Sequence, residues 1–203
     1  MIVVGIAGGV ASGKSFVSEQ LEILGARILD ADRVAHEVLL ETDVKNSIRR
    51  RWGDSVFDNQ GEVNRKEVAK IVFSKSPQGA EDLKYLEGLT HPRIGQRLRK
   101  QMDEFASDKK TKVVVLDAAV MFKAGWDRFC DKIIFVDAPR DVRLARAKSR
   151  GWSEMNFVAR EAAQETLDVK KNHADFVVDN SKSIDETFAQ IQEFWNRYAE
   201  SSF

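Results

Sequence analysis

Five short segments rich in aliphatic and β-branched residues stand out along the chain. They are Ile2–Ile6, Ala26–Leu29, Lys112–Leu116, Lys132–Val136 and Asp175–Val178. In Val113–Leu116 and Ile133–Val136 the apolar run is continuous rather than alternating. Alternation is typical of a strand with one face in water, whereas a continuous apolar run is typical of a strand covered on both faces. The pattern therefore predicts five buried strands.

Helical patterns lie between the predicted strands. Lys14–Leu24 carries apolar residues at helical spacing, and Gly25 follows as a stop signal. Pro139 suits the first turn of another helix, and Ser183–Tyr198 repeats the helical spacing near the end of the chain. Strands that alternate with helices predict an α/β fold with about five parallel strands and helices on both faces of the sheet.

The region from residue 34 to residue 107 breaks this alternation, since it has helical patterns and no convincing strand. Asn64 is expected to cap a helix there. Pro92 is expected to interrupt a longer helical stretch, because proline lacks an N–H group and restricts His91 to extended geometry. The sequence therefore predicts a helical insertion, 34–107, in a core made of 1–33 and 108–203. A charged helical stretch within that core, 151–172, is predicted to be a lid.

Length, charge and cysteine content narrow the class of protein. The 203 residues suffice for one domain or a closely coupled pair. The 32 basic and 32 acidic residues cancel, so no global field attracts nucleic acid or an anionic membrane. The lone Cys130 rules out an internal disulfide and fits a reducing compartment, and no segment approaches the ~20 apolar residues of a membrane span. We expect a cytoplasmic protein with no nucleic-acid or membrane partner, either a monomer or a weak oligomer.

The segment Gly8–Ser15 fits the pattern G-x-x-x-x-G-K-[ST] in full, between a predicted strand and a predicted helix. Glycines allow backbone N–H groups to converge on phosphate oxygens, and the following helix points its positive end at the same anion. Lys14 would contact the β- and γ-phosphates and Ser15 would bind Mg²⁺. An ordinary glycine-rich turn is the alternative. The motif predicts a nucleoside triphosphate site formed by Gly8, Gly9, Val10, Ala11, Ser12, Gly13, Lys14, Ser15 and Phe16.

Carboxylates follow two of the predicted strands. Asp30 and Asp32 come after the second strand, and ligands of doubly wound sheets bind beyond the carboxyl ends of strands. Asp32 can orient or deprotonate an attacking hydroxyl, or hold Mg²⁺ through water; alternatively it caps a helix that begins at Arg33. Asp117, after the third strand, can hold Mg²⁺ through water or cap the next turn. The residues alone leave both choices open.

Arginines recur at steps of three and four in Arg140, Arg143, Arg146 and Arg150, which places them on one stripe of a helix. We expect Arg150 and Arg160, beside and on the predicted lid, to reach the triphosphate and neutralise charge on the transferred phosphoryl group. Arg140 and Arg143 are expected to belong to a solvated basic face.

The order of these motifs resembles the dephospho-CoA kinase family. The matching landmarks are the phosphate loop, Asp30-Ala31-Asp32-x-x-Ala35-His36-x-Val38, His91-Pro92, the segment 117–126, Arg160-x-x-x-Gln164 and the segment 174–180. The landmarks run in family order over nearly the whole chain.

The resemblance implies transfer of the γ-phosphate of ATP, with Mg²⁺, to the ribose 3′-hydroxyl of dephospho-CoA, the last step of coenzyme A synthesis. It implies that Asp32 is the catalytic carboxylate, that the helical insertion binds the acceptor and that the segment 153–172 is the lid. The acceptor site would include His36, His91, Pro92 and Asp117, and the ATP site would include Asn180.

The chain departs from the family pattern at three positions. Ala11 stands where many members have glycine, Phe16 where threonine is usual, and Lys123 where glutamate is usual. The reversed charge at Lys123 keeps open a nucleotide-binding regulator that has lost catalysis. A kinase of the same fold that acts on a nucleoside or nucleotide is the other alternative.

Overall fold

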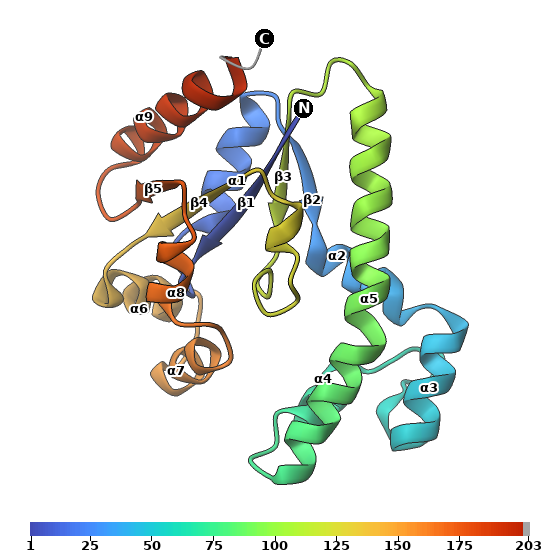
Figure 1. Ribbon diagram of the computed structural model, residues 1–203. Helices are drawn as coiled ribbons and strands as arrows, with labels where there is room; N and C mark the ends of the chain where they lie inside the picture. Colours follow the sequence, from blue (N-terminus) through green and yellow to red (C-terminus); the bar gives the residue numbers. More distant parts are fainter. Residues whose placement is uncertain (201–203) are drawn as a thin grey trace. The chain divides into compact units, whose positions relative to one another are not determined.

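The computed structural model describes residues 1–200 (Figure 1). The chain forms two compact units: Met1–Asp30 together with the chain from Gln101 onward, and Ala31–Lys100. Among the described residues, no helix combines the length and the apolar character needed to cross a lipid bilayer.

The first unit is built on one parallel sheet with the strand order β2-β3-β1-β4-β5. The strands are β1 (Ile2–Gly8), β2 (Arg27–Asp30), β3 (Val113–Asp117), β4 (Lys132–Asp137) and β5 (Phe176–Asp179). The predicted α/β class and the five parallel strands are confirmed. Because β3 and β4 flank β1 on opposite sides, the chain leaves the end of β1 at the point where the strand order reverses, which is where such sheets bind ligands.

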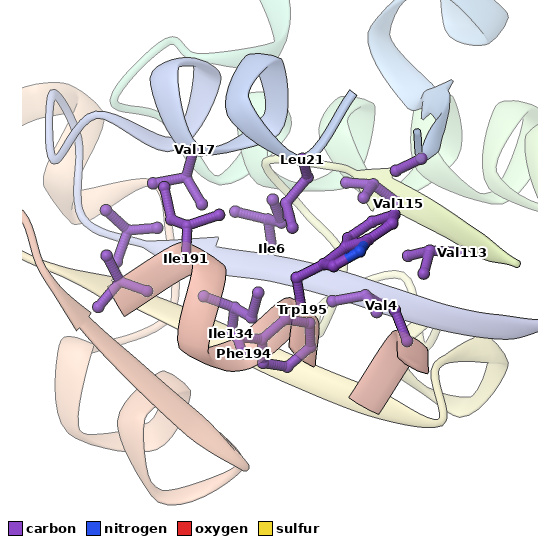
Figure 2. Close-up of a cluster of buried hydrophobic side chains, with 14 residues drawn as sticks. Val4, Ile6, Val17, Leu21, Val113, Val115, Ile134, Ile191, Phe194 and Trp195 are labelled. Carbon is purple, nitrogen blue, oxygen red and sulfur yellow. The ribbon is translucent and has the colours of Figure 1, made fainter. Parts of the chain in front are cut away.

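Two helices, α1 (Lys14–Ile23) and α9 (Ile184–Trp195), cover one face of the sheet. Figure 2 shows Val17 of α1 beside Ile191 of α9, above Ile6 of β1. All three side chains are fully buried, and burial of each is worth roughly 1.5–3 kcal/mol. Ser183 begins α9 with a capping box shared with Glu186. This packing holds the beginning of α1, and therefore the end of the phosphate loop, against the sheet.

The opposite face of β1 needs a glycine. A Cβ atom at Gly5 would lie 2.7 Å from the sulfur of Met121 and 2.8 Å from the sulfur of Cys130. Burial, with Asp127 and Asp131 nearby, raises the pKa of the Cys130 thiol to about 12, so this cysteine behaves as a packing residue.

Three further helices follow β4 and belong to the same unit: α6 (Arg140–Ser149), α7 (Glu154–Ala162) and α8 (Leu167–Asn172). α7 packs on α6 through Phe157, which is fully buried against Ala147 and Val10 of the phosphate loop. The predicted lid segment thus consists of α7 and α8.

The second unit is helical, as its sequence predicts, with α2 (Ala31–Leu39), α3 (Thr42–Trp52), α4 (Arg65–Val72) and most of α5 (Pro77–Ser107). Asn64 caps α4 by accepting hydrogen bonds from the N–H groups of Lys66 at 3.1 Å and Glu67 at 3.4 Å, which confirms the predicted cap. Short 3₁₀ turns at Asp54–Val56 and Asp127–Phe129 and a π-helical segment at Asn196–Glu200 complete the described chain.

The expectation that Pro92 interrupts a helix is wrong. α5 is one helix of 31 residues with Pro92 inside it. A proline ring presses on the carbonyl four residues earlier, and here that residue is Gly88, which has open space where a side chain would begin. Ile94 and Leu98 are buried after the proline. Their burial, at roughly 1.5–3 kcal/mol each, offsets the ~3 kcal/mol cost of an interior proline.

Candidate phosphate-binding site

The phosphate loop joins β1 to α1 and needs its two outer glycines. Gly8 has φ 155°, and a Cβ atom there would lie 2.6 Å from Ser12 Oγ and from the Val136 carbonyl oxygen. Gly13 has φ 102°, and its Cβ atom would lie 2.0 Å from Asn180 Nδ2. Both positions therefore exclude a side chain. Ala11 adopts the left-handed conformation with φ 59° despite its side chain.

The Ser12 carbonyl is held from outside the loop. Asn180 Nδ2 donates to it at 2.7 Å and Arg146 Nη1 at 3.1 Å. Arg146 also donates to the Asn180 carbonyl at 2.8 Å, and Thr187 Oγ1 donates to Asn180 Oδ1 at 3.1 Å. A trans peptide group points its C=O and N–H in opposite directions. The N–H of Gly13 therefore points away from this network, toward the inside of the loop.

Arg143 binds the loop at Val10, two residues before Ser12. Its guanidinium donates to the Val10 carbonyl at 3.3 Å and to the Ala138 carbonyl at 3.0 Å, and it forms an ion pair with Glu161 of α7. The expectation that Arg143 is solvated is wrong, because only 3% of this residue is exposed. Of the four arginines in the stripe, Arg143 and Arg146 contact the loop, and a guanidinium has enough donors to satisfy several carbonyls at once. Arg140 is 53% exposed, as expected.

These contacts shape the loop for an anion. α1 begins at Lys14 with Gly13 as its N-cap and no side-chain hydrogen bond at the cap, so its first N–H groups are available to a ligand. Ser12 Oγ is buried and has no hydrogen-bond partner among the described residues. Lys14 Nζ donates to the carbonyls of Gly8 at 3.5 Å and Gly9 at 3.2 Å. The charge of Lys14, the dipole of α1 and the unpartnered Ser12 hydroxyl together fit a polyphosphate.

The predicted magnesium ligands lie on adjoining elements of the same unit. Ser15 is exposed in the first turn of α1. Asp117, at the end of β3, accepts a hydrogen bond at 3.3 Å from Ser18, which is one turn after Ser15 on α1. No cluster of three metal-ligating side chains occurs within residues 1–200. Mg²⁺ prefers few protein ligands together with water and phosphate oxygens, so this oxygen donor set fits Mg²⁺ carried by a nucleotide.

A small hollow adjoins the loop. Its lining comes from the end of β1, the segment after β3, Lys14 and Lys170 of α8. Lys170 is 3% exposed, and burial together with the nearby Lys14 lowers its pKa to about 8. The roles of Lys170 and Arg146 and the loop contacts of Arg143 were not predicted from the sequence. Nothing in a single sequence distinguishes a buried lysine or arginine of an amphipathic helix from its exposed neighbours.

The remaining predicted residues lie elsewhere. Arg150 is the exposed C-cap residue that follows α6, and Arg160 of α7 is exposed with its guanidinium 4.1 Å from the centre of the Trp152 ring. Phe16 packs its side chain against the core, which leaves only its backbone for the nucleotide. Asn180 is buried and binds the loop, and its direct contact with ATP stays a prediction.

Of the predicted acceptor residues, Asp117 belongs to the first unit and the others belong to the helical unit. Asp32 lies exposed in the first turn of α2 and His36 lies exposed in its last turn. On α5, His91 is half-buried and Pro92 is exposed. α2 begins at Ala31, so the alternative in which Asp32 caps a helix starting at Arg33 is wrong. Asp32 follows β2 by two residues, and Asp30 at the end of β2 pairs in register with Asp117.

The phosphate loop carries a lysine and lies where the strand order of a five-stranded parallel sheet reverses, and two arginines bind its carbonyls. These features define a P-loop kinase fold. The model of one family, dephospho-CoA kinase, matches residues 2–186. The chain belongs to the dephospho-CoA kinase family.

Individual comparisons agree. A dephospho-CoA kinase of Symbiobacterium thermophilum is 34% identical over 197 residues, which cover 96% of this chain and 80% of that protein. A crystal structure of a Thermus thermophilus protein superposes with a TM-score of 0.79 at 29% identity and covers 95% of each chain. A dephospho-CoA kinase from Campylobacter jejuni, at 20% identity and a TM-score of 0.64, shares the fold over 98% of this chain and 97% of its own.

Proposed function

We propose that this protein transfers the γ-phosphate of ATP to the ribose 3′-hydroxyl of dephospho-CoA, which completes coenzyme A. The observation that carries the proposal is the phosphate loop. Asn180, Arg146 and Arg143 bind its Ser12 and Val10 carbonyls from outside, which leaves its amide groups available to an anion. Membership of the dephospho-CoA kinase family supports the choice of acceptor.

Each proposed role follows from the chemistry of the residue. The segment Gly8–Ser15 would bind the triphosphate through backbone N–H groups, and Lys14 would neutralise its terminal oxygens. Ser15 and Asp117 would hold Mg²⁺, which when bound neutralises charge between the β- and γ-phosphates. Asp32 would orient the acceptor hydroxyl and accept its proton.

The insertion 34–107 would bind the acceptor, with His36, His91 and Pro92 as its proposed contacts. The segment 151–172 would act as a lid that excludes water during transfer, because water would otherwise compete as the acceptor. Arg150 and Arg160 are exposed, so both guanidinium groups are accessible to a nucleotide when such a lid closes.

The decisive experiment measures ADP release with ATP, Mg²⁺ and a panel of acceptors made of dephospho-CoA, nucleosides and nucleotides. We expect dephospho-CoA to give the highest kcat/KM. Lys14→Ala should lower kcat/KM by roughly 10²–10³-fold, because the lysine stabilises charge that grows during transfer. A stronger preference for a nucleoside or nucleotide would contradict the proposed acceptor. Tight binding of ATP without turnover would instead support the alternative of a nucleotide-binding regulator that has lost catalysis. In that case we expect the substitution Lys123→Glu to restore activity.

We also propose that the protein works in the cytoplasm, since its lone cysteine is a packing residue and forms no disulfide. Its proposed partners are the two small substrates alone. The zero net charge supports the absence of a nucleic-acid partner.

A further inference from the structure

Lys170 is a buried cation without a carboxylate partner. Only 3% of the residue is exposed. Its Nζ atom donates to Gln164 Oε1 at 2.7 Å and to the Gly8 carbonyl at 3.5 Å. Among the described residues, no carboxylate lies within ion-pair distance of this Nζ atom. Both partners are neutral acceptors, so they satisfy two donors of the ammonium group and leave its charge uncompensated.

The charges around Lys170 make this arrangement costly. Burial, the charge of Lys14 and the charge of Arg143 all disfavour the ammonium form, and only Glu165 favours it at longer range. The result is a pKa lowered from 10.5 to about 8. A buried cation with no structural task is replaced at little cost by an apolar residue. An anion that enters between the cations would remove the penalty.

The geometry indicates where that anion lies. Lys14 Nζ and Lys170 Nζ each lie 3.5 Å from the same Gly8 carbonyl oxygen, which limits their separation to twice that distance. Both lysines line the same small hollow beside the phosphate loop. The oxygens of one phosphate group can accept hydrogen bonds from two ammonium groups at such a separation.

We propose that Lys170 is a second lysine contact for the terminal phosphates of the nucleotide, and that Gln164 is the residue that positions it. This inference rests on the proposed function, because it assumes that the loop holds a triphosphate. Lys14 is the lysine of the phosphate loop itself, which in such loops contacts the terminal phosphates. Lys170 reaches the same anion from α8, and the amide oxygen of Gln164 orients the ammonium group without neutralising it.

The test compares Lys170→Met with Lys171→Met, a matched control on the same helix. Lys171 is half-exposed and forms an ion pair with Asp137 at 2.9 Å, so its removal costs little. Binding of ATP is measured by calorimetry with the full-length protein and Mg²⁺, and thermal unfolding is measured without nucleotide. We expect Lys170→Met to weaken ATP binding by roughly 10–100-fold, to unfold at or above the wild-type temperature, and to bind AMP as the wild type does. Lys171→Met should match the wild type in binding.

Two further variants make the test specific. Gln164→Leu should weaken ATP binding by less than Lys170→Met, and Lys170→Arg should restore part of the affinity because it keeps the charge. The affinity advantage of the wild type over Lys170→Met should be full below pH 8 and should shrink as the pH rises above it, since the free ammonium of Lys170 loses its proton near there.

The outcomes separate the two proposals. Wild-type ATP affinity in Lys170→Met, with the expected loss in Lys14→Ala, overturns the role of Lys170 and leaves the proposed function standing. Unchanged affinity in both variants contradicts the phosphate loop itself, and with it the proposed function. A loss of ATP affinity that Lys170→Arg does not restore, with lower thermal stability, shows a structural role and also overturns the inference.

Discussion

Asp32 is the residue on which the proposed chemistry depends. It is exposed in the first turn of α2. A carboxylate that orients or deprotonates a hydroxyl acts in the transition state, whereas the triphosphate is bound by other residues. Its removal should therefore affect turnover and not the affinity for ATP.

For Asp32→Asn we expect kcat to fall by roughly 10²–10⁴-fold, the usual contribution of a positioned general base. The dissociation constant for ATP should change by less than about threefold. Steady-state kinetics and calorimetry measure the two quantities. Asp43→Asn is the control, because Asp43 has the same place in the first turn of α3 and binds Arg93 at 2.6 Å. Equal turnover in both variants would remove Asp32 from the mechanism.

At the scale of elements, α6 and α7 matter because they hold the phosphate loop in shape. Arg143 of α6 connects the Val10 carbonyl to Glu161 of α7, so the predicted lid segment and the loop share one buried guanidinium. Phe157 packs beside this link against Val10. The hydrogen bonds and the apolar contact thus couple the position of α7 to the conformation of the loop.

Glu161→Gln removes the charge from this link and keeps its shape. We expect the free energy of unfolding to fall by about 1–2 kcal/mol, since a charge-assisted hydrogen bond to a buried group becomes a neutral one. ATP affinity should fall with it. Urea denaturation measures the first quantity and calorimetry the second. Glu154→Gln is the matched control: Glu154 is 52% exposed and pairs with Lys148 at 3.5 Å, so we expect less than about 0.5 kcal/mol. If Glu161→Gln lowers the free energy of unfolding by no more than Glu154→Gln does, the link does not couple α7 to the loop.

At the scale of the whole molecule, Lys170 gives stability a characteristic dependence on pH. Its pKa in the folded protein is about 8, against 10.5 as the ordinary value. Between these two pH values the unfolded chain binds more protons than the folded chain, so the free energy of unfolding rises with pH in this window. Below pH 8 the destabilising effect of Lys170 is present in full.

We therefore expect the stability advantage of Lys170→Met over the wild type to be largest below pH 8 and to decline as the pH rises to about 10.5. The decline should be on the order of 3–4 kcal/mol, the free energy equivalent of a pKa lowered from 10.5 to about 8. Denaturation of both proteins at a series of pH values measures this difference. A difference that does not change with pH would show that Lys170 is not perturbed in the folded protein.

Much of the fold could be predicted from local patterns. Continuous apolar runs such as Val113–Leu116 identify buried strands because both faces of such a strand leave water. The predicted helix break at Pro92 was wrong. A local rule for proline takes no account of Gly88 four residues earlier or of the burial of Leu98 after the proline. Tertiary burial overrode a local preference there.

The sequence by itself determined the phosphate loop, since its glycines, Lys14 and Ser15 are adjacent in the chain and their chemistry follows from their order. Tertiary structure alone decided which distant cations meet that loop. Arg143 and Lys170 lie more than a hundred residues from it along the chain and reach it only through the packing of α6 and α8. The physical reason is that burial and charge compensation depend on which residues are neighbours in space. The folded structure determines these neighbours, and the local sequence does not encode them.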